Sequence, residues 1–274
     1  MDFRQPFDFA GKVAVVTGGG GVLCSAMASA LAQCGASVVV LGLGLTRAEK
    51  VAAAIRAGGG QAVAMQANVL EKATLETVAA RTIERYGHID ILINGAGGAK
   101  KEATTSPQLS FFDLPEEAVR YVFDLNLLGT FFSCQVFGRY MAQQKSGNIL
   151  NIASYGAYRP LTRSVAYSAG KAAVINFTQW LAVHLSQEYS PDIRVNALVP
   201  GFFLTEQNRF LLYDQQTGAL TERGQRILAH TPMARLGQPE DLVGPALFLL
   251  SGVSRFVHGA TLVVDGGISA YGGV

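Results

Sequence analysis

The chain of 274 residues has few charged side chains: Asp, Glu, Lys and Arg make up 15% of it, and its formal net charge is +2. The longest basic run is the pair Lys100-Lys101, so the sequence has no basic block that would hold a nucleic-acid backbone. Hydrophobic residues make up 49%. That share excludes an intrinsically disordered chain and is enough for a sizeable core.

Long hydrophobic runs and paired cysteines are also lacking. No segment approaches the roughly 18 consecutive apolar residues of a membrane span, and residues 1–6 have no apolar signal core. Cys24, Cys34 and Cys134 are far apart in the sequence and form no C-x-x-C pair, which is typical of reduced cysteines. The four histidines show no metal-ligand spacing with cysteines or carboxylates. We therefore expect a cytoplasmic protein that binds no metal, membrane or nucleic acid.

Short β-branched apolar runs alternate with helical patterns along the chain. Strands are predicted over residues 12–17, 37–41, 61–66, 89–93, 148–153, 193–198 and 261–264. Helices are predicted after the first strand to residue 36 and over 46–57, 71–86, 115–144 with an interruption near 126–129, 165–188 and 239–251. Continuous apolar strands separated by helices are typical of a parallel sheet buried on both faces. The sequence predicts an α/β fold: one Rossmann-like, doubly wound parallel sheet of about seven strands over residues 1–274, with a small helical flap at about 200–232.

A run of four glycines follows the first predicted strand. Thr17 ends that strand, and Gly18 to Gly21 lead directly into a helix. Glycines at such a junction let the backbone approach a diphosphate, and the free N–H groups of the helix start attract its negative charge. This pattern indicates a nucleotide site at the carboxyl edge of the sheet.

Two polar side chains in a later helix suggest proton transfer. Tyr167 and Lys171 are four residues apart in the predicted helix 165–188, so they share one face. A nearby ammonium favours the phenolate, and we expect it to lower the pKa of Tyr167. Ser154 ends the preceding strand, where its hydroxyl can polarise a substrate oxygen.

These motifs together resemble the short-chain dehydrogenase/reductase family. The resemblance rests on the motifs Thr17-Gly18, Asn94-Gly95-Ala96-Gly97, Tyr167-x-x-x-Lys171, Pro200-Gly201 and Asp265-Gly266-Gly267, and it covers the chain from Gly11 onward. It implies an NAD(P)-dependent oxidoreductase with four catalytic residues: Asn126, Ser154, Tyr167 and Lys171. In that family the asparagine bends its helix and holds a water that leads to the lysine.

The sequence departs from the family pattern at four positions. The pattern T-G-x-x-x-G-x-G would place glycines where Val22 and Cys24 stand. The second asparagine of the family's N-N-A-G is Gly95, and the acidic residue expected beside the adenine is Asn68. The displaced glycines leave the path of the phosphate loop open.

The resemblance also implies the residues that contact the cofactor. They are Gly18, Gly20, Gly21, Val22, Leu23, Arg47, Asn68, Val69, Asn94, Ala96, Gly97, Tyr167, Lys171, Pro200, Gly201, Phe203 and Thr205. An acid at the end of the second strand would select NAD, but Gly42 stands there. Arg47 and Lys50 lie just downstream and can meet a 2′-phosphate. The sequence thus favours NADP slightly and leaves NAD open.

Within the family, several segments resemble the D-mannonate oxidoreductase (D-fructuronate reductase) branch. They are residues 17–23, 103–107, 159–163, 201–209 and 220–224. A sugar acid needs a cation for its carboxylate and polar groups for its hydroxyls, and the predicted substrate-binding residues are Lys100, Arg163, Asn208 and Arg209. Another sugar-acid or polyol dehydrogenase, such as a ketogluconate reductase, and a non-catalytic nucleotide sensor remain alternatives. The resemblance further implies a homo-oligomer, a dimer or tetramer.

Overall fold

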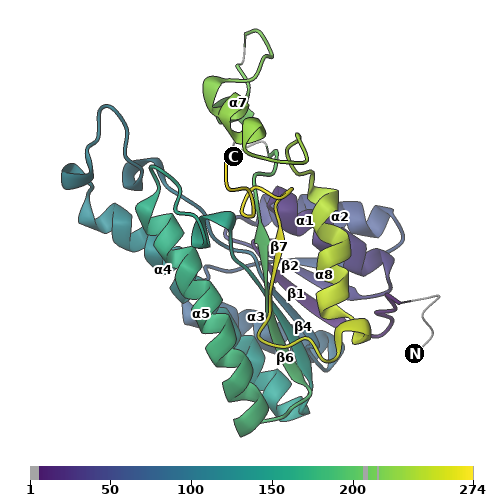
Figure 1. The fold of residues 1–274 in the computed structure, drawn as a ribbon. Helices are drawn as coiled ribbons and strands as arrows, with labels where there is room; N and C mark the ends of the chain where they lie inside the picture. The colour runs from purple at the N-terminus through teal and green to yellow at the C-terminus, as the bar shows by residue number, and fades with distance from the viewer. Residues whose placement is uncertain (1–5, 206–208, 215, 274) are drawn as a thin grey trace.

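A parallel sheet of seven strands forms the centre of the molecule (Figure 1). The computed structural model describes residues 6–205, 209–214 and 216–273. The strand order is β3-β2-β1-β4-β5-β6-β7, and every neighbouring pair is parallel. The strands are β1 (Val13–Thr17), β2 (Ser37–Gly42), β3 (Gln61–Gln66), β4 (Ile91–Asn94), β5 (Gly147–Ile152), β6 (Ile193–Pro200) and β7 (Thr261–Val264).

The order of the strands reverses between β1 and β4, which pair in the middle of the sheet. Their register sets Thr17 opposite Asn94 at the carboxyl ends. All residues of β1, β4 and β6 are buried, because helices cover both faces of the sheet. In an open parallel sheet, ligands bind beyond the carboxyl ends at such a reversal. The fold therefore positions the candidate site next to the ends of β1 and β4.

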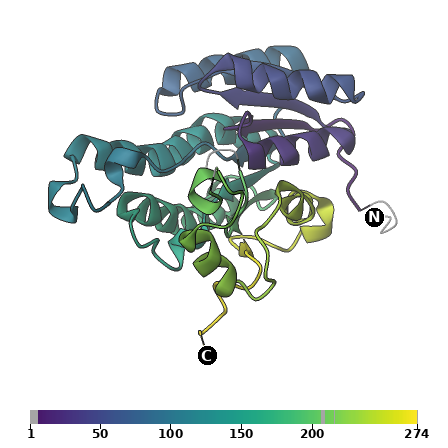
Figure 2. The ribbon, with the colours of Figure 1, turned by 90° about the horizontal axis from the view of Figure 1, so that it is seen from above.

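Helices pack on both faces of the sheet (Figure 1, Figure 2). α1, α2 and α8 share one apolar core with the sheet, and α3, α4 and α5 share the other. Within the described ranges, no helix is both long enough and apolar enough to cross a membrane. The helices are α1 (Val22–Gln33), α2 (Leu45–Ala57), α3 (Lys72–Tyr86), α4 (Glu116–Gln144), α5 (Val165–Glu188), α6 (Arg209–Leu212), α7 (Glu222–Ala229) and α8 (Val243–Leu250).

The structure confirms the predicted α/β fold and its seven strands, and it corrects one helix. α4 runs without a break from Glu116 to Gln144, so the predicted interruption near residues 126–129 is wrong. Asn126 sits inside this helix with its amide donating to the Val122 carbonyl one turn earlier. A buried asparagine with partners on its own helix and on a neighbouring loop does not need to break the helix.

The connection from β6 to β7 carries α6 and α7, which stand beyond the carboxyl edge of the sheet (Figure 1). Leu212, Ile227 and Leu236 form a small apolar cluster of their own in this segment. Two hydrogen bonds close its base: the Gly237 N–H donates to the Phe202 carbonyl, and the Leu204 N–H donates to the Gly237 carbonyl. The segment that the sequence predicts as a flap thus has an apolar cluster of its own, and backbone hydrogen bonds join its two ends.

Candidate active site

The connection between β1 and α1 is a tight glycine turn. The Gly21 N–H donates to the Gly18 carbonyl at 2.9 Å, and the Gly19 N–H donates to the Leu41 carbonyl at the end of β2 at 2.8 Å. Gly18 has a φ of +64°, and a Cβ there would lie 2.8 Å from the backbone of Gly95. Glycine is needed at this point because a side chain would force the two loops apart.

The amino end of α1 fits the diphosphate of a dinucleotide. Gly21 is its N-cap, no described side chain caps it, and its first turn holds no acidic residue. Its first N–H groups, including those of Val22 and Leu23, carry partial positive charge. A Cβ at Gly20 would lie 2.9 Å from the Cβ of Arg47, so α2 closes on the same turn. A backbone cradle that only glycine permits is a suitable anion site.

Thr17 joins the glycine turn to the loop after β4, a role that the sequence analysis missed. Its hydroxyl accepts hydrogen bonds from the N–H groups of Gly95 and Ala96, each at 3.2 Å. The side chain is 1% exposed. A hydroxyl at the last position of an otherwise apolar buried strand is the signal that could have revealed it.

Tyr167 and Lys171 lie one turn apart on α5, as their spacing predicts. The Tyr167 hydroxyl forms a hydrogen bond with Ser154, two residues beyond β5. The Lys171 ammonium lies 5.9 Å from the centroid of the Tyr167 ring and donates to the Ile152 carbonyl at 2.7 Å. The structure thus brings together three of the four predicted catalytic side chains.

Burial controls the protonation of this pair. It raises the pKa of Tyr167, and the hydrogen bond from Ser154 only partly opposes that effect. Burial also lowers the pKa of Lys171 to about 8. The pKa of Tyr167 thus moves opposite to the predicted direction, because removal from water outweighs the effect of its polar neighbours. Tyr167 therefore carries its proton at neutral pH.

The fourth predicted catalytic residue, Asn126, holds the loop after β4. Its Oδ1 accepts from the Gly98 N–H at 3.1 Å, and its Nδ2 donates to the Gly98 carbonyl at 2.8 Å. A Cβ at Gly97 would lie 2.6 Å from Asn126 Oδ1 and 3.1 Å from Lys171 Nζ. Gly97 therefore packs directly against both side chains, and Asn126 fixes the floor of the site.

Three of the predicted cofactor contacts have side chains engaged elsewhere. Asn94 is 1% exposed, and its Nδ2 donates to Asn151 Oδ1 at 2.8 Å inside the core. The Asn68 amide donates to Glu71 at 2.8 Å, and the ring of Phe203 is buried in the core. A contact of the cofactor with Asn94 or Phe203 would therefore be made mainly through their backbone atoms.

The other predicted cofactor contacts lie at or beyond the carboxyl ends of β1, β2, β3, β4 and β6, or on α5. They are Gly18, Gly20, Gly21, Val22, Leu23, Arg47, Val69, Ala96, Gly97, Tyr167, Lys171, Pro200, Gly201 and Thr205. Because parallel strands end at one edge, these residues gather along the same side of the sheet. This edge can hold an extended dinucleotide.

The predicted substrate-binding cations are exposed and come from three segments of this edge. Lys100 follows β4, Arg163 precedes α5, and Arg209 begins α6. Lys100 lies 5.4 Å from the centroid of the Tyr121 ring, and Arg209 lies 5.5 Å from that of Tyr213. In the described part of the chain, none of the three forms an ion pair with a carboxylate. Asn208 lies outside the described residues.

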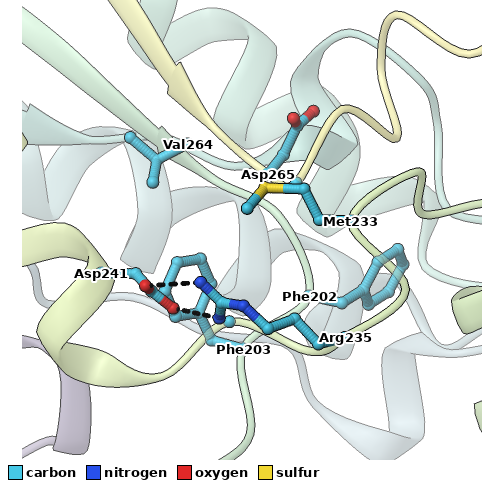
Figure 3. Close-up of a pocket in the computed structure, with 9 residues that line it drawn as sticks. Phe202, Phe203, Met233, Arg235, Asp241, Val264 and Asp265 are labelled. Atoms are coloured by element: carbon cyan, nitrogen blue, oxygen red, sulfur yellow. Dashed lines mark hydrogen bonds and ion pairs between the residues drawn. The ribbon is translucent and has the colours of Figure 1, made fainter.

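A cavity of about 230 Å³ lies beside the base of the flap (Figure 3). Arg235 forms two hydrogen bonds with Asp241, at 2.6 and 2.8 Å, and these hold the pKa of Asp241 at about 2. The Asp265 carboxylate accepts from the N–H groups of Gly267 and Ser269. Because these charged side chains already have partners within the protein, we interpret the cavity as a packing feature at the base of the flap and not as a ligand site. Its lining residues are Phe202, Phe203, Met233, Arg235, Gly237, Asp241, Val264, Asp265 and Gly266.

No metal cluster is found in the part of the chain that the structure describes. There, no group of three or more His, Cys, Asp or Glu side chains is arranged to hold an ion.

Comparisons with known proteins agree with this geometry. The family model described as enoyl-(acyl carrier protein) reductase matches residues 22–269. An uncharacterised oxidoreductase, UxuB, of Bacillus subtilis is 45% identical over 97% of this chain and 98% of its own. The crystal structure of a proposed D-mannonate oxidoreductase from Haemophilus influenzae, with bound NAD, has a TM-score of 0.93 and 43% identity over 100% of both chains.

A second solved structure resembles the chain at lower identity. It is a proposed NAD(P)-dependent gluconate 5-dehydrogenase from Beutenbergia cavernae, with NADP bound at low occupancy. Its TM-score is 0.85 and its identity 34%, over 97% of this chain and 99% of that one. Both solved structures therefore carry a nicotinamide dinucleotide.

Proposed function

Since the chain belongs to the short-chain dehydrogenase/reductase family and is an NAD(P)-dependent oxidoreductase of alcohol or ketone groups, we propose that it interconverts D-mannonate and D-fructuronate. The observation that carries the choice of a sugar acid is a set of exposed cations on segments at the carboxyl edge of the sheet. Lys100, Arg163 and Arg209 come from three segments and have no carboxylate partner among the described residues. Free cations of this kind suit an anionic substrate.

Tyr167 is the proton donor and acceptor of the proposed reaction. A bound nicotinamide supplies or accepts the hydride. In reduction, the neutral phenol gives its proton to the oxygen of the forming alcohol, and in oxidation the deprotonated phenol takes that proton back. Because burial raises the pKa of Tyr167, the phenol holds a proton that it can donate at neutral pH.

Three further side chains support that proton transfer. The Ser154 hydroxyl, bonded to Tyr167, holds the substrate oxygen beside the phenol. Lys171 places a buried ammonium next to the ring and beside Gly97, where the ribose of a nicotinamide nucleotide would lie. Asn126 keeps the loop at Gly98 in place. The four side chains thus act through proximity and acid–base chemistry.

For the cofactor we propose a preference for NADP. Arg47 is exposed, and its Cβ packs on Gly20 of the glycine turn, so a guanidinium is available beside the adenosine ribose. Gly42 at the end of β2 provides no carboxylate that would repel a 2′-phosphate. The Haemophilus influenzae neighbour contains NAD, which keeps NAD as the alternative.

The experiment that tests the function is an assay of the purified protein with D-fructuronate and D-mannonate. Each is paired with NADPH or NADH, or with the oxidised cofactors, and nicotinamide absorbance is followed at 340 nm, the ordinary wavelength for this assay. We expect turnover that depends on the sugar acid and is faster with NADPH. Turnover with ketogluconates alone would move the assignment to a ketogluconate reductase.

The distant alternative is a nucleotide-binding sensor without catalysis. It would bind NADPH yet show no turnover with any sugar acid or polyol. The contact between Tyr167 and Ser154 and the buried Lys171 favour an enzyme, because such groups are costly to bury without a function.

We also propose that the chain forms a homo-oligomer through α4 and α5, which lie side by side (Figure 1, Figure 2). Trp180 and Val183 on α5 are 55% and 56% exposed. Trp180 stacks on His184 with ring centroids 4.7 Å apart, so two stacked rings lie on this face of α5. Light scattering of the purified protein tests this proposal, and a monomer would contradict it. Cytoplasmic localisation stays a prediction.

A further inference from the structure

The connection between β4 and α4 carries a lysine whose backbone is fixed from both sides. Before it, both backbone groups of Gly98 are bonded to the Asn126 side chain. After it, Ala103 is buried in a cluster with Ala166 against which the Tyr167 ring also packs. Lys100 therefore lies on a short segment that is anchored at each end to the catalytic side chains.

The length of the chain limits how far this lysine can lie from the catalytic side chains. Gly97 packs against Lys171, since a Cβ on it would lie 3.1 Å from the Nζ atom. Lys100 follows Gly97 by three residues, so their Cα atoms are within roughly 10 Å of each other. An extended lysine side chain can then reach a substrate that is bound at Tyr167.

The ammonium of Lys100 is also held in place by a ring. It lies 5.4 Å from the centroid of Tyr121 on α4. The Lys100 carbonyl accepts from the Thr104 hydroxyl at 2.8 Å and from the Ala103 N–H at 3.1 Å. A cation–π contact orients an ammonium without neutralising it, so its charge stays available for an anion.

The other cations of this edge are held less directly. Arg209 lies over Tyr213 within the flap segment, away from the anchored connection. Arg163 is joined to the same connection through its backbone, because its carbonyl accepts from the Thr105 N–H at 3.0 Å. Its guanidinium has no partner among the described residues. Of the three, Lys100 is the one that combines a segment anchored to Asn126 and to the cluster of Tyr167 with an ammonium positioned over a ring.

We propose that Lys100 binds the carboxylate of the substrate and that Tyr121 is its positioning residue. The inference rests on the proposed sugar-acid function and deepens it by assigning the group that selects an acid over a neutral polyol. A lysine ammonium forms a charge-assisted hydrogen bond with a carboxylate. Its removal weakens binding of the acid and leaves the proton transfer at Tyr167 intact.

The test compares Lys100→Met with the matched control Lys101→Met in the full-length protein. Lys101 is the adjacent residue, has the same charge and is also exposed. We expect Lys100→Met to raise the KM for D-fructuronate by roughly 10- to 100-fold with kcat changed less than about threefold. Lys101→Met should keep KM within about twofold. The Kd of NADPH, measured by fluorescence, should be the same in both variants.

Two substitutions at Tyr121 separate positioning from a structural role. Tyr121→Leu removes the ring, and we expect it to raise KM about fivefold, within the range of a cation–π contact. Tyr121→Phe keeps the ring and should restore most of that loss. In the double variant Lys100→Met/Tyr121→Leu, the second substitution should add nothing, because the cation that the ring positions is already absent.

The outcomes distinguish this inference from the proposed function. If the wild-type protein turns over D-fructuronate but Lys100→Met has the KM of Lys101→Met, the assignment of Lys100 is wrong and the function stands. Equal losses in kcat for D-fructuronate and in NADPH affinity would also overturn it, since they indicate a displaced loop. If the wild-type protein turns over no sugar acid, the function and the inference both fail.

Discussion

The thiol of Cys24 occupies the space that a side chain at residue 95 would need. A Cβ built on Gly95 would overlap the Sγ of Cys24, which is 5% exposed in the core between α1 and the end of β4. The family pattern has a glycine at position 24 and an asparagine at position 95. Here the larger side chain is at position 24 and the glycine is at position 95, so the two departures compensate each other in volume. The helix α1 therefore still packs closely on the end of β4.

A double-mutant cycle tests this exchange. Gly95 does not have a positive φ, so the strain in Gly95→Ala comes from the thiol, and we expect it to lower the free energy of unfolding by about 2 to 3 kcal/mol. Cys24→Ala should cost about 1 kcal/mol. The double variant should cost no more than about 1 kcal/mol, a coupling of about 2 kcal/mol. Urea denaturation measures all three. Gly244→Ala, where nothing lies within 4 Å of the new Cβ, is the control, and additive costs would refute the exchange.

Tyr167→Phe tests the proton transfer. The substitution removes the phenolic oxygen that is bonded to Ser154 and keeps the ring, so we expect kcat to fall by about 10²- to 10⁴-fold. The Kd of NADPH should stay within about twofold, because the backbone cradle of the glycine turn is untouched. Tyr189→Phe serves as the control, since Tyr189 is an exposed tyrosine at the carboxyl end of α5, more than five turns from Tyr167. Wild-type turnover by Tyr167→Phe would remove Tyr167 from the mechanism.

The buried Lys171 makes stability depend on pH in a defined direction. Its pKa falls from 10.5 to about 8 on folding, so the unfolded chain binds more protons between these values and the free energy of unfolding rises with pH there. The loss of stability caused by burying the protonated Lys171 is complete below pH 8 and decreases toward pH 10.5. Relative to Lys171→Met, we expect the wild-type protein to gain about 2 kcal/mol between pH 7 and pH 9.5. Urea titrations at the two pH values measure this, and a constant difference would show that Lys171 does not titrate in this range.

Arg47 should decide how strongly the enzyme prefers NADPH. Without its guanidinium a 2′-phosphate loses a charge-assisted partner, so we expect Arg47→Ala to raise the KM for NADPH about tenfold and to leave the KM for NADH unchanged. Arg56→Ala is the matched control, because Arg56 is in the last turn of the same helix and its guanidinium is already paired with Glu49. Steady-state kinetics with both cofactors provide the readout. Equal changes for NADPH and NADH would contradict a contact with the 2′-phosphate.

Local patterns predicted the sheet and its helices well. The bounds of β3 and β7 and those of α5 are the predicted ones. They could be predicted because the spacing of apolar residues along a strand or helix reflects which of its faces must be buried. The interruption predicted in α4 was wrong for a related reason. A polar residue in an apolar helix looks like a break, but Asn126 finds its partners on Gly98, 28 residues earlier, and no local pattern reveals such a contact.

The sequence by itself determined the α/β fold, the glycine turn at its carboxyl edge and the shared helix face of Tyr167 and Lys171, since each follows from spacing along a strand or helix. Only the tertiary structure decided that Cys24 fills the space at Gly95, that Lys100 rests on Tyr121, and that Tyr167 keeps its proton. Contact across distant segments and removal from water are properties of the packed chain. For that reason the order of the residues predicted a set of candidate site residues, but it could not predict their protonation or their partners.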